Sequence, residues 1–74
     1  MITYFKSQKD LANALINLID SYWCSEINEQ LFLERINEIV SKNNEKVYRE
    51  EDYTSVIRQR LGKRRIELLD KVLK

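Results

Sequence analysis

The scarcity of residues that interrupt a regular backbone is the strongest constraint on this chain. Its 74 residues include no proline and a single glycine, Gly62. A fold of many strands needs turn residues about every 8–12 positions, whereas helices need them only at their ends. The composition therefore favours helices, and the length favours one small helical domain over residues 1–74.

A chain this short lies near the lower limit for a core that folds without help. The sequence has one cysteine, Cys24, and no histidine. An internal disulfide and a structural zinc site of the usual kind are therefore excluded. Stability is expected to come from helix packing, with a partner or a second copy of the chain as an additional source.

Apolar residues recur with a helical period over residues 8–23, which predicts the first helix. Ser7 is expected to cap its N-terminus, and Asp10 suits the helix dipole in the first turn. A second helix is expected to begin after Asn28 and to fade in the polar stretch 41–44. The expected inward residues are Leu11, Ala12, Ala14, Leu15, Ile16, Leu18, Ile19, Tyr22 and Trp23 in the first helix and Phe32, Leu33, Ile36, Ile39 and Val40 in the second.

Residues 45–52 carry the weakest pattern in the sequence. Val47 and Tyr48 form a short extended piece that can pair with residues 2–5, although an isolated two-stranded ribbon is only marginally stable. The acidic residues that follow suit the start of another helix, and Asp52 is expected to cap it.

The C-terminal region admits two interpretations. In the first, Gly62 ends a short helix that begins at Tyr53, and a separate last helix follows. In the second, residues 53–73 form one helix, and Gly62 inside it costs about 1 kcal/mol relative to alanine. We favour the break at Gly62. The expected fold is an all-α bundle of about four helices, with room for a minor two-stranded extended pair.

Positive charge is concentrated in the same region. The net charge is +1 overall, but residues 1–54 hold six Lys and Arg against ten Asp and Glu, and residues 55–74 hold seven against two. Arg65 would lie among the apolar positions of the last helix, and a violated local rule of this kind often marks a functional site. Five residues on either side of Gly62 form what we call the basic cluster: Arg58, Arg60, Lys63, Arg64 and Arg65.

Three interpretations of the basic cluster stay open. The segment 53–74 is typical of a helix-turn-helix that meets DNA or RNA phosphates, although the net charge is low for such a domain. Alternatively, the cluster and nearby aromatic residues bind an acidic protein surface, or the acidic half of another copy. In the third, the guanidinium groups pair with acidic residues of the same chain and the cluster is structural. A contact of Arg58 or Arg65 with Glu50, Glu51 or Asp52 would indicate this role.

The residues of ordinary enzyme catalysis are missing. Without histidine there is no Ser–His or Cys–His pair, and one glycine excludes a glycine-rich phosphate loop.

No signal peptide or membrane-spanning stretch is evident, and the single cysteine fits a reducing cytosol. We therefore expect a cytoplasmic, non-enzymatic interaction module, a small regulator or inhibitor without cofactor, metal or small-molecule substrate. A protein partner or a homodimer is preferred, and nucleic acid is the alternative.

The sequence also resembles a known group of proteins. The run YTSVIRQRLGKRRIELL at residues 53–69, with LANAL at 11–15 and the Tyr22–Trp23 pair upstream, is similar to short conserved hypothetical proteins of Firmicutes and their mobile elements. The resemblance covers most of the chain. It implies a bacterial or phage cytosolic setting, and it carries no assigned activity or binding residue to this sequence.

Overall fold

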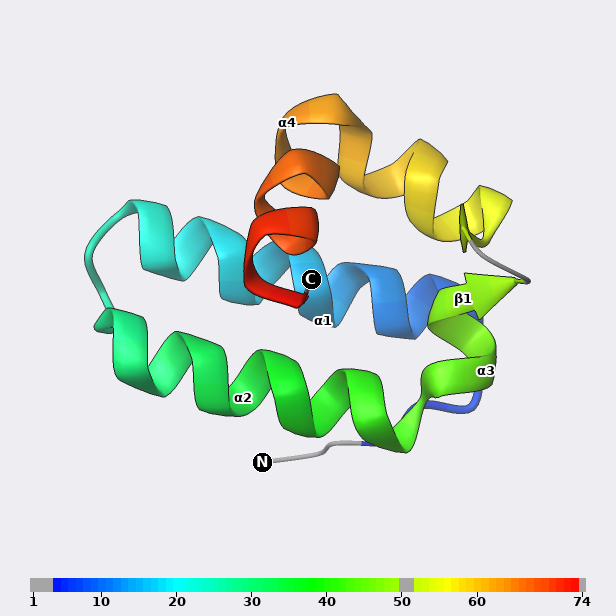
Figure 1. Cartoon of the computed structure of the whole chain (residues 1–74), viewed down its shortest axis with the longest axis horizontal. Helices are drawn as coiled ribbons and strands as arrows, with labels where there is room; N and C mark the ends of the chain where they lie inside the picture. The colour runs from blue at the N-terminus through cyan, green and yellow to red at the C-terminus, as the bar shows by residue number, and fades with distance from the viewer. Residues whose placement is uncertain (1–3, 50–51, 74) are drawn as a thin grey trace.

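The computed structural model describes residues 4–49 and 52–73, and these form four helices and one short antiparallel strand pair (Figure 1). The order is α1 (Gln8–Trp23), α2 (Glu29–Lys42), α3 (Asn44–Val47), β1 (Tyr48–Arg49), β2 (Asp52–Tyr53) and α4 (Ser55–Leu73). The predicted all-α class with a minor extended pair is confirmed.

Helices α1 and α2 run antiparallel beside each other, and α4 covers α1 from the other side (Figure 1). The Ser7 hydroxyl accepts a hydrogen bond from the Asp10 amide at 3.1 Å, and the Asn28 side chain accepts one from the Leu31 amide at 2.8 Å. Each cap satisfies an amide that has no partner within its own helix. Both predicted N-termini are therefore confirmed.

The core lies where α1, α2, α3 and α4 meet. Its largest side chains are at most 1% exposed and come from every helix. They include Leu11, Leu15, Ile19, Phe32, Ile36, Val47, Ile57, Leu61 and Leu69. The predicted inward faces of α1 and α2 supply most of this set, as the helical period requires.

A buried asparagine connects the N-terminal segment to the end of α2. Asn43 is 1% exposed; its Oδ1 accepts from the Phe5 amide at 3.0 Å, and its Nδ2 donates to the Ile39 carbonyl at 2.7 Å. Phe5 therefore lies against the polar end of α2 and not in a strand. The predicted extended piece of Val47 and Tyr48 is wrong for Val47, which ends α3. Tyr48 pairs with Tyr53 and not with residues 2–5, of which residues 2 and 3 lie outside the described part of the chain.

The start of α4 differs from the prediction by a few residues. Asp52 and Tyr53 belong to the strand pair, where the Tyr53 ring stacks on Tyr48 with centroids 5.3 Å apart. The helix begins at Ser55, and the Thr54 hydroxyl accepts from the Ile57 amide at 3.5 Å. Thr54 thus takes the capping place predicted for Asp52, because pairing with the preceding strand holds Tyr53 extended.

Gly62 interrupts α4. Its φ is 79° and its ψ is 169°, a backbone conformation that is open almost exclusively to glycine. The helix therefore consists of two segments, 55–61 and 63–73, and the chain changes direction sharply between them (Figure 1). The predicted break at Gly62 is confirmed.

Replacing Gly62 tests whether the bend depends on glycine. A Cβ at this position would meet no heavy atom within 4 Å, so the cost of Gly62→Ala is backbone strain alone. We expect a loss of about 1–3 kcal/mol in the free energy of unfolding, measured by urea titration. Gln59→Ala, at an exposed position of the same helix, should change it by less than about 0.5 kcal/mol. Equal effects of the two changes would contradict a strained Gly62.

Replacing Asn43 tests its connecting role. Asn43→Ala leaves the Phe5 amide and the Ile39 carbonyl without this partner, and we expect it to lower the free energy of unfolding by about 1–3 kcal/mol. The neighbouring Asn44 is exposed, and Asn44→Ala should cost less than about 0.5 kcal/mol. Hydrogen exchange should also accelerate at the Phe5 amide in the Asn43 variant only, and an unchanged rate there would argue against the contact.

Candidate macromolecule-binding surface

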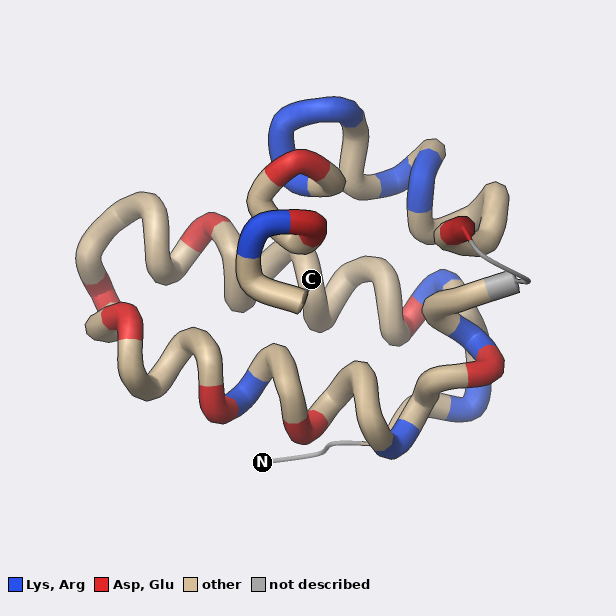
Figure 2. Tube along the Cα trace, viewed as in Figure 1, with Lys and Arg blue, Asp and Glu red and all other residues tan. Residues whose placement is uncertain are grey.

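The basic cluster lies along α4 on both sides of the bend, where Figure 2 shows the basic positions gathered. Arg65 is half-buried, whereas the other four members are exposed. The structure divides the five side chains by what their charged groups contact.

Arg65 is held inside the fold by several contacts. Its Nε and Nη2 donate to Asp20 Oδ1 at 3.1 and 3.0 Å, and Nη2 also donates to Asp20 Oδ2 at 3.1 Å. Its Nη1 donates to the Leu61 carbonyl at 3.1 Å, and its guanidinium lies 5.9 Å from the centre of the Trp23 ring. A planar guanidinium with five donors suits such a set of contacts, which a lysine ammonium cannot reproduce.

Arg58 pairs with Asp52 at the surface. Its Nη2 donates to Asp52 Oδ1, and this hydrogen bond raises the pKa of the Arg58 guanidinium above its ordinary value. Both side chains are more than half exposed, so the pair lies in water. A contact between Arg58 and Asp52 is what the structural interpretation of the basic cluster predicted. Glu50 and Glu51, the other acidic partners considered, lie outside the described residues.

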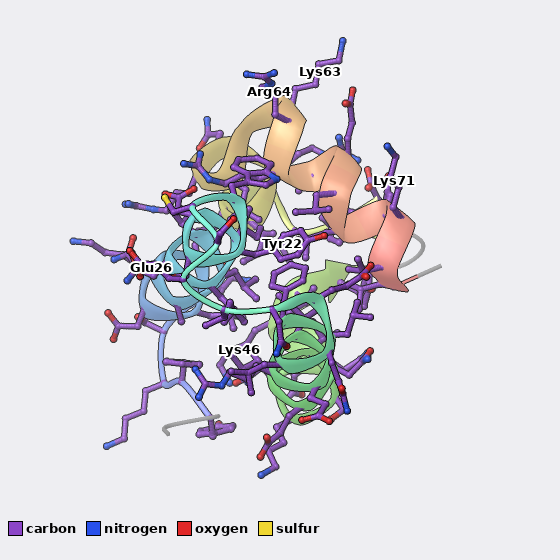
Figure 3. The ribbon with its side chains drawn as sticks, turned by 90° about the vertical axis from the view of Figure 1, so that its left-hand side faces the viewer. Tyr22, Glu26, Lys46, Lys63, Arg64 and Lys71 are labelled. Atoms are coloured by element: carbon purple, nitrogen blue, oxygen red, sulfur yellow. The ribbon has the colours of Figure 1, made fainter. Side chains whose placement is uncertain are left out.

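The remaining three cations point outward. Within residues 4–49 and 52–73, no acidic side chain forms an ion pair with Arg60, Lys63 or Arg64. Figure 3 shows Lys63 and Arg64 extending away from the body of the molecule at the bend. The basic cluster therefore separates into two arginines with acidic partners and three exposed cations that form no ion pair with the described acidic residues.

Trp23 adds an aromatic ring to this surface. It is 48% exposed, and Trp23 and Arg64 line a hollow of about 320 Å³. The sequence pattern placed both Tyr22 and Trp23 on the inward side of the helix, and this is wrong for Trp23. Tyr22 does turn inward and stacks on Phe32, with ring centroids 4.4 Å apart. Trp23 is the last residue of α1, and its ring is backed by the guanidinium of Arg65.

A second hollow of about 400 Å³ lies inside the bend of α4. The Tyr53 hydroxyl donates to Asp70, one of its lining residues, at 2.8 Å. Burial, followed by this hydrogen bond, raises the pKa of Tyr53 above its ordinary value, so the hydroxyl stays a donor. The lining mixes both signs of charge and comprises Arg58, Gly62, Lys63, Ile66, Glu67 and Asp70.

The described residues form neither a metal-binding cluster nor a membrane-spanning helix. No three Cys, Asp or Glu side chains within residues 4–49 and 52–73 gather closely enough to hold a metal ion. In the same ranges, every helix falls short of the length or apolar character that crossing a bilayer requires. What these residues do bring together is an aromatic ring beside exposed cations.

Matched lysine substitutions test the division of the basic cluster. Arg65→Lys keeps the charge but loses the paired hydrogen bonds to Asp20 and the contact with Leu61, and we expect it to cost about 1–2 kcal/mol. Arg58→Lys, at an exposed pair, should leave the free energy of unfolding nearly unchanged. Urea titration of both variants measures the difference, and similar losses would contradict a structural role specific to Arg65.

Comparison with known protein families identifies the family of this chain. A family model described as "Conserved hypothetical protein" matches residues 2–74, which is nearly the whole chain. Neither the curated proteins nor the solved structures yield a match. The match agrees with the resemblance drawn from the sequence, and the chain belongs to this family of conserved hypothetical proteins.

Proposed function

We propose that this chain is a non-enzymatic interaction module, a small regulator or inhibitor that acts by binding a protein partner. The observation that supports it most is the half-exposed Trp23 beside Arg64, with Arg60 and Lys63 nearby on α4. Trp and Arg are the residue types most enriched among those that dominate binding energy at protein interfaces.

The setting of Trp23 suits such a contact. Its ring is backed by Arg65, whose guanidinium is itself held by Asp20 and the Leu61 carbonyl. A ring held in place before binding loses little conformational entropy when a partner covers it. Burying the remaining exposed part of a tryptophan also removes a large apolar area from water.

The charge of α4 next to Trp23 favours an acidic patch on the partner where it meets α4. Arg60, Lys63 and Arg64 have no acidic partner among the described residues, so their field extends into solvent. Complementary charge steers association and selects among partners more than it adds affinity. We therefore expect the cations to set the choice of partner and Trp23 to supply most of the binding energy.

The alternative is a DNA- or RNA-binding role for the segment 53–74. Two short helices meeting at Gly62, with three exposed cations around the turn, support it. Arg58 and Arg65 already contact Asp52 and Asp20, so about three cations remain for phosphates. Three phosphate contacts would make duplex affinity fall roughly 40-fold between about 50 and 200 mM salt.

Two parallel measurements test the proposal. Immobilised protein is used to capture partners from a bacterial lysate, and the Trp23→Ala variant and the Arg60→Glu, Arg64→Glu double variant are compared with it. We expect a protein that the unchanged chain retains and that both variants lose. Lys9→Glu, an exposed charge reversal in the first turn of α1, should retain it.

The second measurement is fluorescence anisotropy of a labelled mixed-sequence duplex and a labelled single strand at about 50 and 200 mM salt. We expect no saturable binding at either salt concentration. Binding with the roughly 40-fold salt effect, abolished by the double variant, would favour the nucleic-acid role. That result, with no captured protein sensitive to Trp23→Ala, would overturn the proposal.

A further inference from the structure

One end of the molecule carries exposed charges of both signs in the segments around Trp23. Glu26 and Glu29 are exposed in the connection from α1 to α2 and at the start of α2. Lys63 and Arg64 are exposed at the bend of α4. We call these four residues and Trp23 the end face.

Trp23 neighbours both charged groups. Arg64 and Trp23 line the same hollow. The Glu26 amide donates to the Ser21 carbonyl at 2.9 Å, so the chain folds back onto the last turn of α1 directly after Trp23. Figure 3 shows Glu26 and Arg64 on the side of the molecule that faces the viewer, well separated from each other.

This layout is complementary to itself. When two identical faces meet across a two-fold axis, each patch meets the patch that lies opposite it across the axis. The acidic side of one end face would then meet the basic side of the other, and the two Trp23 rings would meet near the centre. A uniformly acidic surface would instead be attracted by Lys63 and Arg64 and repelled by Glu26 and Glu29.

Size supports the same partner. A domain of 74 residues buries a smaller share of its surface than a larger one, so covering a tryptophan that is 48% exposed is a substantial gain. We infer that the end face pairs two copies of this chain in a two-fold dimer, with Trp23 at the centre and Glu26 of each copy against Arg64 of the other. The inference rests on the proposed function, because it names the partner of the same surface.

Sedimentation equilibrium in reducing buffer, at protein concentrations from about 10 μM to about 1 mM, tests the dimer. We expect a monomer–dimer equilibrium that Trp23→Ala weakens at least tenfold, since central aromatic residues dominate such interfaces. Glu26→Lys and Arg64→Glu should each weaken it, whereas Lys9→Glu should leave it unchanged. The double variant Glu26→Lys, Arg64→Glu should restore the affinity of the unchanged chain, because the exchanged charges meet again across the axis.

The double variant also separates a lost contact from a lost fold, since misfolded single variants would not be rescued by a second change.

Cys24 gives an independent readout of which face is used, because it is the only cysteine, it is exposed and it follows Trp23 directly. A short bismaleimide should crosslink two copies through Cys24, and less so in Trp23→Ala. Three results would each overturn the inference: a monomer throughout the concentration range, a dimer unaffected by Trp23→Ala, or failure of the double variant to dimerise.

The outcomes for the dimer and for the proposed function can be told apart. If the chain stays monomeric but still captures another protein through Trp23 and Arg64, the dimer is overturned and the proposed regulation of another protein is supported. If the chain forms a dimer that depends on Trp23 and captures no other protein, the dimer is supported and the proposed regulation of another protein is overturned.

Discussion

The guanidinium of Arg65 contacts the Asp20 carboxylate, the Leu61 carbonyl and the Trp23 ring, and the position of the C-terminal helix depends on it. It joins residues 63–73 to Asp20 of α1 and to the carbonyl of Leu61, which ends the first segment of α4. Gly62 allows the chain to turn between those two segments. A lone arginine among apolar positions would be costly, but here its donors are met by a carboxylate and a carbonyl that needs a partner. The arginine at an apolar position therefore has a structural role, because its contacts fix the bend of α4 that carries Lys63 and Arg64.

Features that depend on near neighbours in the chain were predictable. The caps at Ser7 and Asn28 each join residues three positions apart, and the inward faces of α1 and α2 follow from a period of 3.6 residues. The break at Gly62 follows from one residue type, because glycine alone adopts its conformation without strain. In each case the deciding interaction lies within a turn or two of helix.

The parts that sequence reasoning missed depend on residues far apart in the chain. Asp20 and Arg65 are 45 positions apart, and Asn43 meets Phe5 across 38 positions. Helical periodicity treats Tyr22 and Trp23 as neighbours on one face, yet only contact with Phe32 decides which ring turns inward. The cap at Thr54 similarly depends on a strand pair that holds Tyr53 extended. No local sequence pattern predicts these contacts, because each depends on residues that only the tertiary structure brings together.

In a sequence rich in charge, the fold decides which charged side chains are left for a partner. An arginine that breaks a local rule suggests a binding site, but the fold can resolve the conflict internally, as it does for Arg65. Within the basic cluster, the described residues leave Arg60, Lys63 and Arg64 without an ion pair, and Arg64 stands at the bend beside Trp23. Arg65 contributes to that surface indirectly, because it holds α4 against α1 and backs the ring of Trp23. The structural ion pair and the adjacent surface that we propose for binding are thus one arrangement, in which the paired charges fix the positions of the exposed ones.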